Sequence, residues 1–449
     1  MSIRKGIAKS LVVMAAFSMA AGFGGQGSPL SGAALPFFAS CEAAASHIDA
    51  SIRPLQLDVQ THFTVDGDDA GDLLRTSVAQ VNFVGSAEAA GVMELQKALW
   101  KYDADAMNRG QEIREQMLAI AAQDRAERQA AGANFFAAHE SLTDVFVRRA
   151  DTLAVSLMEF HQSYEGGVHG MYGVTGRNFD AETGQPLSLA DVIADKEKLA
   201  EAVKAGLRRR YPKASFAEGG STLMAEMVDQ MLRDDVLPWT LDPTGVSFYF
   251  NPYLIGSYAE GIFTATVLFD EHPALFAERY RRAPAAWCLE LRPYLPARVS
   301  FADGSRAEVN ITTSDSGLRI TMDGAVLNDS GETAGLRPVL VSLADGRRYL
   351  YVDSVDAGDT WETLSVFDLN GAAPVRVPMK QRMTRRADVA EDFADMERGE
   401  PKNDACADKS FYIMADPENF RLTLLDAETG QARLVTCRVG ADGTPEILR

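Results

Sequence analysis

Three side chains that could bind a metal recur at four-residue spacing in the middle of the chain. His161, Glu165 and His169 would lie on one face of an α-helix, and imidazole and carboxylate groups are common zinc ligands. Gly166 and Gly167 interrupt this stretch, and paired glycines disfavour a continuous helix. We therefore expect neither a metal site nor a cofactor here. We interpret His169 as a residue that contacts a ligand or hydrogen-bonds the turn.

The same stretch predicts a sharp change of chain direction. Residues Tyr164–Gly170 read YEGGVHG, and glycine tolerates the positive φ that such a turn requires. A shorter polar turn follows at Glu182–Gly184, and Ser188 is a typical helix N-cap. These residues supply a well-defined turn but little chemistry.

A second group of polar and aromatic residues lies roughly 80 residues downstream. Tyr249, Asn251, Tyr253 and Tyr258 surround Pro252. Aromatic rings offer contact area and amides offer hydrogen bonds, as protein or glycan contacts need. The alternative is structural, with the tyrosines packing the last pair of strands. Both interpretations stay open.

Together the two blocks resemble a known extracytoplasmic domain. YEGGVHG…NFDAETGQPLSL, followed by FYFNPYLIGSYAEGIFTATVLF at Phe248–Phe269, looks like the domain of the anti-sigma factor RsiV. The same domain precedes the catalytic domain of the peptidoglycan deacetylase PdaC. The resemblance covers about residues 50–292. The matching positions are Gly166, Gly167, His169, Gly170, Asn178, Phe179, Asp180, Gly184, Asn251, Pro252, Tyr253, Tyr258, Ala259 and Gly261.

The resemblance implies a helix-and-antiparallel-sheet fold that binds a ligand associated with the cell wall, which in the anti-sigma factor is lysozyme. Neither a sigma-binding segment nor a deacetylase domain is recognised here, so signalling and deacetylation are not carried over. We expect a binding site in the two blocks, formed by Glu165, Gly166, Gly167, His169, Tyr172, Asn251, Tyr253 and Tyr258.

Composition narrows the class of partner. The chain has 449 residues, which predicts two or three domains, and a net charge of −19. This charge argues against nucleic acid and anionic membranes, and it favours encounter with a basic protein. Solubility alone would also explain it.

The first residues predict export. Arg4, Lys5 and Lys9 precede an apolar run at Leu11–Phe17, which is typical of a signal peptide. We assign residues 1–23 to the signal peptide and 24–49 to a linker. No later stretch reaches the ~20 apolar residues of a membrane span, so we expect a periplasmic or extracellular protein. A lipid anchor at Cys41 is the less favoured alternative.

The cysteines of an exported chain predict disulfides. Cys406 and Cys437 share the C-terminal region, whereas Cys41 and Cys288 bracket the segment before it. The simplest pairing is 406–437 with 41–288, although other connectivities and free thiols at Cys41 and Cys288 stay open.

Hydrophobic periodicity predicts an α+β fold in two parts. Residues 50–292 mix strands with helices, including a long Ala-rich helix over 88–129. Residues 293–449 show short strand patterns separated by Asp-Gly and Asn-Gly turns. We expect an all-β C-terminal domain, as a sandwich or barrel rather than a small propeller.

These patterns favour a non-enzymatic binding protein of the cell envelope that recognises a basic protein, such as lysozyme, or a cell-wall glycan. The chain lacks HExxH, GxSxG and phosphate-loop motifs. Two alternatives stay open: a structural envelope protein without a soluble ligand, and a cell-wall hydrolase or deacetylase with an unrecognised site, for which His169 and Asp180 are the candidate residues.

Overall fold

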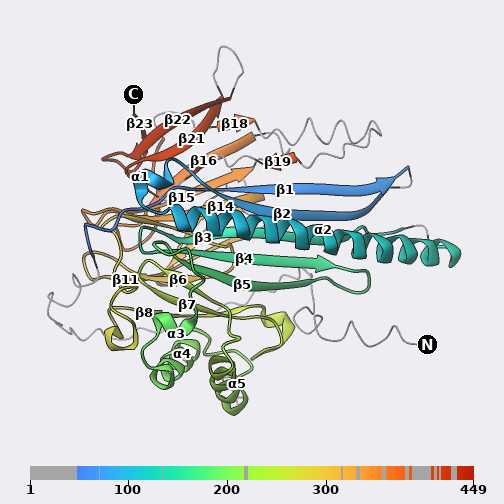
Figure 1. Ribbon diagram of the computed structural model, residues 1–449, viewed down its shortest axis with the longest axis horizontal. Coiled ribbons are helices and arrows are strands. Elements are labelled where there is room, and N and C mark those ends of the chain that lie inside the picture. Colours follow the sequence, from blue (N-terminus) through green and yellow to red (C-terminus); the bar gives the residue numbers. More distant parts are fainter. Residues whose placement is uncertain are drawn as a thin grey trace.

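The structure of the protein is a computed structural model (Figure 1). The predicted signal peptide, almost all of the predicted linker and most of the charged segment 380–401 lie outside the residues that it describes. Those residues are 48–69, 71–133, 135–216, 221–314, 317–329, 334–355, 361–379, 384–386, 406–408, 412–413, 416–425 and 432–448.

The N-terminal part is built on a sheet with the strand order β19-β1-β2-β3-β4-β5. Neighbouring strands are antiparallel except β2 and β3, which pair in parallel. The long helix α2 crosses one face of this sheet and extends with the β1–β2 hairpin beyond it (Figure 1). The bounds are β1 (Leu57–Asp68), β2 (Gly71–Phe83), α1 (Ala87–Ala90), α2 (Met93–Ala130), β3 (His139–Ala150), β4 (Ala154–Tyr164), β5 (Met171–Asp180) and β19 (Cys406–Asp408).

A helical layer and a small sheet follow. The helices α4 and α5 share an apolar core with the sheet β6-β7-β8. Ser188 is the N-cap of α3, as predicted, and Asp195 caps α4 by accepting from the Lys198 N–H. The bounds are α3 (Leu189–Val192), α4 (Lys196–Arg210), α5 (Ser221–Arg233), β6 (Trp239–Asp242), β7 (Gly245–Phe250), η2 (Tyr258–Glu260), β8 (Phe263–Leu268) and η3 (Pro273–Leu275).

The C-terminal part stacks antiparallel sheets. Their orders are β10-β11-β12-β13, β17-β16-β15-β14-β9 and β20-β21-β22-β23, with β18 pairing with β16. The bounds are β9 (Trp287–Glu290), β10 (Ala297–Ser300), β11 (Arg306–Ser314), β12 (Gly317–Met322), β13 (Ala325–Asp329), β14 (Ala334–Ser342), β15 (Arg348–Val355), β16 (Trp361–Asp368), β17 (Val375–Arg376), β18 (Thr384–Arg386), β20 (Tyr412–Ile413), β21 (Phe420–Leu425), β22 (Ala432–Val439) and β23 (Pro445–Ile447).

The central sheet of this part is buried on both faces because its side chains alternate. Leu340 and Leu350 pack toward β10–β12, whereas Val339 and Tyr351 pack toward β21 and β22. The α+β class with a largely all-β C-terminal part is therefore confirmed. The sheets of the described residues stack, and none of them closes into a barrel.

The two parts are joined by strand pairing. β9 precedes the predicted boundary between residues 292 and 293, yet it pairs with β14 of the C-terminal part. In the other direction, β19 adds to β1 in the N-terminal sheet. The exact domain limits stay a prediction, but the parts share sheets.

Two of the cysteines can be placed. Cys288 and Cys437 are free, and both are buried in one apolar cluster between β9 and β22. Cys41 and the side chain of Cys406 lie outside the described residues. The predicted pairing of Cys437 with Cys406 and of Cys288 with Cys41 therefore stays a prediction. No helix in the described part of the chain has the length and apolar character needed to cross a membrane.

Candidate functional site

The YEGGVHG stretch forms the turn between β4 and β5, as predicted. Gly166 and Gly167 have φ of 81° and 98°, a conformation that side-chain-bearing residues rarely adopt. The Tyr164 hydroxyl closes the turn by donating to the Gly167 carbonyl at 3.1 Å. Val168 at its tip is 80% exposed, so the turn presents its tip to solvent.

A buried histidine anchors this turn to the end of α2. His139 is fully buried, and its Nε2 lies 3.3 Å from Asp124 Oδ2. Its ring stacks on Phe136 and meets Tyr164 edge-on, with centroids 5.7 and 6.1 Å apart. Hydrogen bonds from Arg128 and His139 lower the pKa of Asp124. Packing and charge together therefore fix the position of the turn.

The aromatic residues of the two sequence blocks meet beside the turn. His169 stacks on Tyr258, with centroids 6.0 Å apart and planes 15° apart. Tyr258 also contacts Tyr172 at 5.5 Å and Tyr253 at 5.6 Å. Burial and the neighbouring Tyr172 raise the pKa of Tyr258 well above its usual range. We call His169, Tyr172, Tyr253 and Tyr258 the aromatic cluster; it joins residues more than 80 positions apart.

Asn251 positions this cluster. Its Oδ1 accepts from the Val174 N–H at 2.8 Å, and its Nδ2 donates to the Val174 carbonyl at 3.2 Å. The side chain thus pairs with β5 as a strand neighbour would, and it holds the segment that carries Tyr253 and Tyr258. A ligand contact by Asn251, like one by Glu165, stays a prediction.

The aromatic cluster borders an open groove of about 930 Å³. His169 and Tyr172 line one side, and residues 135–138 and 292–295 line the others. Phe135 and Tyr294 are exposed on its lining, at 77% and 55%. Sequence reasoning missed Phe135, Phe136, Phe160, Arg292 and Tyr294; only the Phe135–Phe136 doublet after a polar helix gave a signal.

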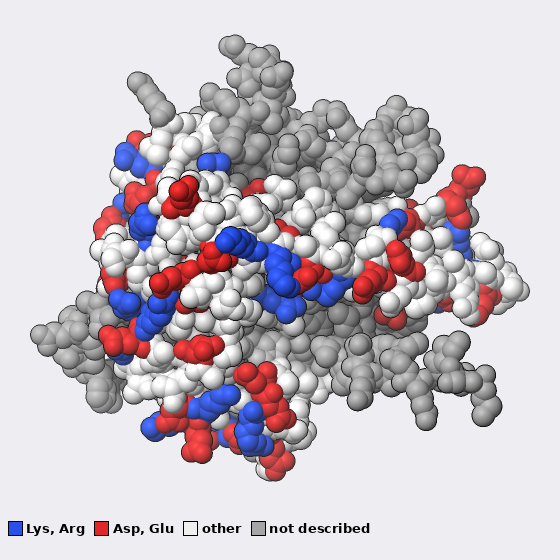
Figure 2. Space-filling view, viewed as in Figure 1, with Lys and Arg blue, Asp and Glu red and all other residues white. Residues whose placement is uncertain are grey.

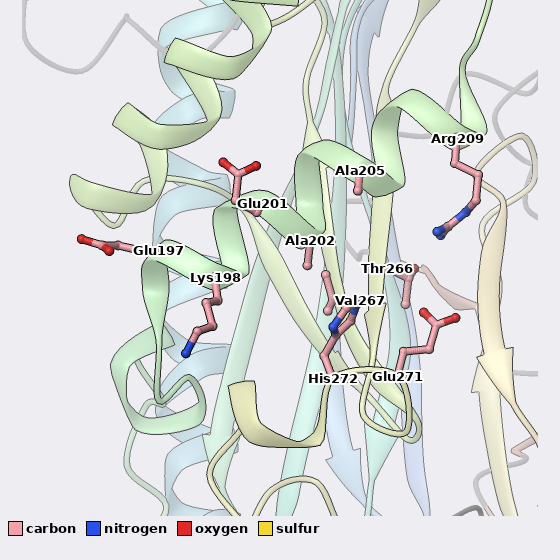
Figure 3. A pocket seen from close by; sticks show the side chains of 10 residues that line it. All are labelled: Glu197, Lys198, Glu201, Ala202, Ala205, Arg209, Thr266, Val267, Glu271 and His272. Carbon is pink, nitrogen blue, oxygen red and sulfur yellow. The ribbon is translucent and has the colours of Figure 1, made fainter. Parts of the chain in front are cut away.

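A smaller hollow lies between α4 and β8, with a volume of about 580 Å³ (Figure 3). Its charged side chains are mostly satisfied by neighbours. Glu271 pairs with Arg298, and Lys198 pairs with Asp195 at 2.7 Å. Its lining has His272 but no phenylalanine, tyrosine or tryptophan. The groove beside the aromatic cluster is therefore the better candidate for ligand recognition.

The structure does not bring together the three residues of the metal site that the sequence spacing suggested. His161 lies within β4, whereas Glu165 and His169 lie in the turn that follows, so the three residues share no helix. No group of three or more metal-binding side chains gathers among the described residues. His169 and Asp180 lie near opposite ends of β5, about 30 Å apart at ~3.3 Å per residue. These two residues therefore do not lie side by side, and a hydrolase or deacetylase with an unrecognised site stays a prediction.

A polar cluster lies on the face of the sheet that α2 covers. Buried Glu159 accepts from Tyr102 at 2.8 Å, Arg177 Nε at 3.0 Å and Thr175 at 3.1 Å. Burial alone would raise the pKa of Glu159, but the His161 hydrogen bond and the charge of Arg177 outweigh burial and lower it to about 2. The carboxylate therefore stabilises the fold in its ionised form.

This cluster predicts acid sensitivity. The pKa of Glu159 is lower in the fold than the ordinary 4.5, so its stabilisation is present above pH 4.5 and is lost as the pH falls toward 2. The shift corresponds to ~3 kcal/mol. Urea unfolding at a series of pH values should show a flatter acid limb for Glu159→Gln than for the wild type. The exposed Glu94→Gln serves as control, and equal slopes for all three proteins would contradict the prediction.

The fold and the groove define a class: a two-part α+β protein with an open, aromatic-lined surface. Residues 190–270 match the family DUF3298, whose description is "Protein of unknown function". This match includes Asn251, Tyr253 and Tyr258, whereas the YEGGVHG turn lies before it.

Two solved structures of DUF3298 family members are similar to the chain. One, from Bacteroides fragilis, is 18% identical with a TM-score of 0.39, and the match covers 50% of this chain and 94% of that one. The other, from Pseudomonas aeruginosa, is 16% identical with a TM-score of 0.32, covering 52% and 98%. No curated protein matches the chain.

Proposed function

We propose that this chain is an exported, non-enzymatic binding protein of the cell envelope and that its groove receives a cell-wall glycan. The observation that carries the proposal is the meeting of the two sequence blocks: the His169–Tyr258 stack stands beside an open groove lined by further rings. Aromatic faces pack on the apolar faces of sugar rings, and nearby polar groups orient the hydroxyls. The resemblance to the RsiV-like domain, whose relatives act at the cell wall, supports the same ligand class.

A second candidate ligand is a basic protein such as lysozyme. The net charge of −19 would accelerate encounter with such a partner. Figure 2 shows acidic and basic side chains intermingled along α2 rather than one acidic patch on that face. We therefore rank the glycan first, because the aromatic-lined groove is a defined binding surface, whereas this face shows no single acidic patch for a basic protein.

Co-sedimentation with purified peptidoglycan, beside capture on immobilised lysozyme, tests the proposal. We expect saturable binding to peptidoglycan that Tyr294→Ala weakens about tenfold, since loss of one anchoring ring costs about 1–2 kcal/mol. Trp100→Ala is the matched control, because Trp100 on α2 is 58% exposed and lies outside the groove. Binding to lysozyme but not to peptidoglycan would favour the second candidate, and binding to neither would overturn the proposed function.

A further inference from the structure

The groove contains an arginine whose charge is not neutralised by a neighbour. Arg292 follows β9, and its guanidinium carbon lies 4.1 Å from the centre of the Phe160 ring. Nη1 donates to the Pro293 carbonyl at 2.8 Å. Only one of the several N–H donors of the guanidinium is used in this way. The side chain is thus held flat on an aromatic ring within the lining of the groove.

Two arginines that are buried more deeply than Arg292 have carboxylate partners. Arg148 pairs with Asp242 at 2.6 Å, and Arg149 pairs with Asp151 at 2.7 Å. Within the described part of the chain, Arg292 forms no ion pair; Asp144 acts on it only from a greater distance. Burial lowers the pKa of Arg292, as expected for a partly desolvated guanidinium that has no carboxylate beside it. A guanidinium in this position is suited to an anion supplied by a ligand.

The carboxylates that line the groove are already satisfied. Glu260 accepts hydrogen bonds from Ser215 and Ser257 at 2.7–2.8 Å, and these outweigh burial and lower its pKa to about 2. Glu140 lies 3.6 Å from Arg75 at the other side. Glu260 keeps its negative charge, whereas Arg292 is a cation of the lining that has no carboxylate partner among the described residues, in a protein whose net charge is strongly negative.

We propose that Arg292 binds a carboxylate of the ligand, so that the groove selects an acidic glycan over a neutral one. The single positive charge matches a monoanionic carboxylate, whose planar oxygens fit a guanidinium fork. The rings of Phe160, Tyr172 and Tyr294 would pack on the sugars beside it. The inference rests on the proposed function, because it names the ligand class for the same groove.

Calorimetric titration of the full chain tests the inference with defined probes. The first is a peptide-free tetrasaccharide in which every second sugar carries a lactyl-ether carboxylate, and the second is the same tetrasaccharide with those carboxylates amidated. The third is the same tetrasaccharide with stem peptides joined to those carboxyl groups through amide bonds, which places the free carboxylates on the peptide instead. We expect the acidic tetrasaccharide to bind at least ~10-fold more tightly than its amide, as is typical of a lost charge-assisted hydrogen bond. Tight binding of the third probe alone would assign the carboxylate to the peptide.

Arginine variants supply the matched comparison. Arg292→Gln should bind the acidic and the amidated tetrasaccharide equally, whereas Arg438→Gln, at an arginine that pairs with Glu446 outside the groove, should keep the preference. If Arg292→Gln does not fold, the wild-type comparison of the three probes decides alone. Equal wild-type affinity for all three probes overturns the role of Arg292 and leaves the proposed function standing. Absence of binding to every probe overturns both.

Discussion

Replacement of Asp242 by asparagine is expected to lower the free energy of unfolding by about 3–5 kcal/mol, because it leaves a buried guanidinium without its counter-charge. Arg148 and Asp242 are 4% and 1% exposed. The pair is bidentate, with Nε donating to Oδ1 at 3.0 Å and Nη2 to Oδ2 at 2.6 Å. Urea unfolding measures the loss.

The size of this effect follows from where the pair lies. Arg148 on β3 also donates to the Glu290 carbonyl on β9 at 2.9 Å, and Asp242 on β6 accepts from Thr240 and Ser247. One ion pair thus connects the N-terminal sheet, the small sheet and the first strand of the C-terminal part. Loss of one partner leaves several buried hydrogen-bonding groups without a partner, and this is costly in the protein interior.

A matched surface pair gives the control for this prediction. Arg75 and Asp72 lie 2.8 Å apart, but their side chains are 52% and 42% exposed. Asp72→Asn should therefore cost at most about 1 kcal/mol. The double replacement Arg148→Met with Asp242→Leu should recover most of the loss, since apolar packing often substitutes for a buried ion pair. A loss below about 1 kcal/mol for Asp242→Asn would show that the pair does not hold the sheets together.

Gly176→Ala is the second replacement with a large expected effect. An added Cβ would lie 1.8 Å from the Trp239 carbonyl oxygen, which is backbone and cannot rotate away. Asn178 donates to that same carbonyl at 3.1 Å, so β6 is held against β5. The sheets must separate to admit a methyl group, and we expect a cost of about 3 kcal/mol. Thermal unfolding of the variant measures this cost.

Gly206→Ala is the control that distinguishes the steric clash at Gly176 from the general effect of replacing a glycine by alanine. Gly206 lies within α4, and its added Cβ would be 3.7 Å from the Ala265 Cβ, an ordinary contact. Alanine is the better helix former by ~1 kcal/mol, so this variant should be as stable as the wild type or more stable. Similar melting temperatures for Gly176→Ala and the wild type would contradict the close approach of β5 and β6.

Local patterns predicted much of the fold. The long helix predicted over residues 88–129 corresponds to α1 and α2. Helix periodicity and glycine or aspartate turns act over a few residues, so the chain carries this information locally. For the C-terminal part, the sequence predicted an all-β class but not which sheets stack on one another, because stacking depends on contacts between strands that are distant in the sequence.

In the candidate site too, local features were predictable from the sequence, whereas contacts between distant residues were not. The sequence alone determined the YEGGVHG turn and the helix cap at Ser188, because backbone conformation and capping are set by neighbouring residues. Only the tertiary structure decided that His169 stacks on Tyr258 and that Arg292 lies on Phe160. These partners are separated by about 90 residues or more, and no local periodicity encodes which side chains meet. The fold brings His169 and Tyr258 together because β4 pairs with β5 and because Asn251 ties the segment that carries Tyr258 to β5.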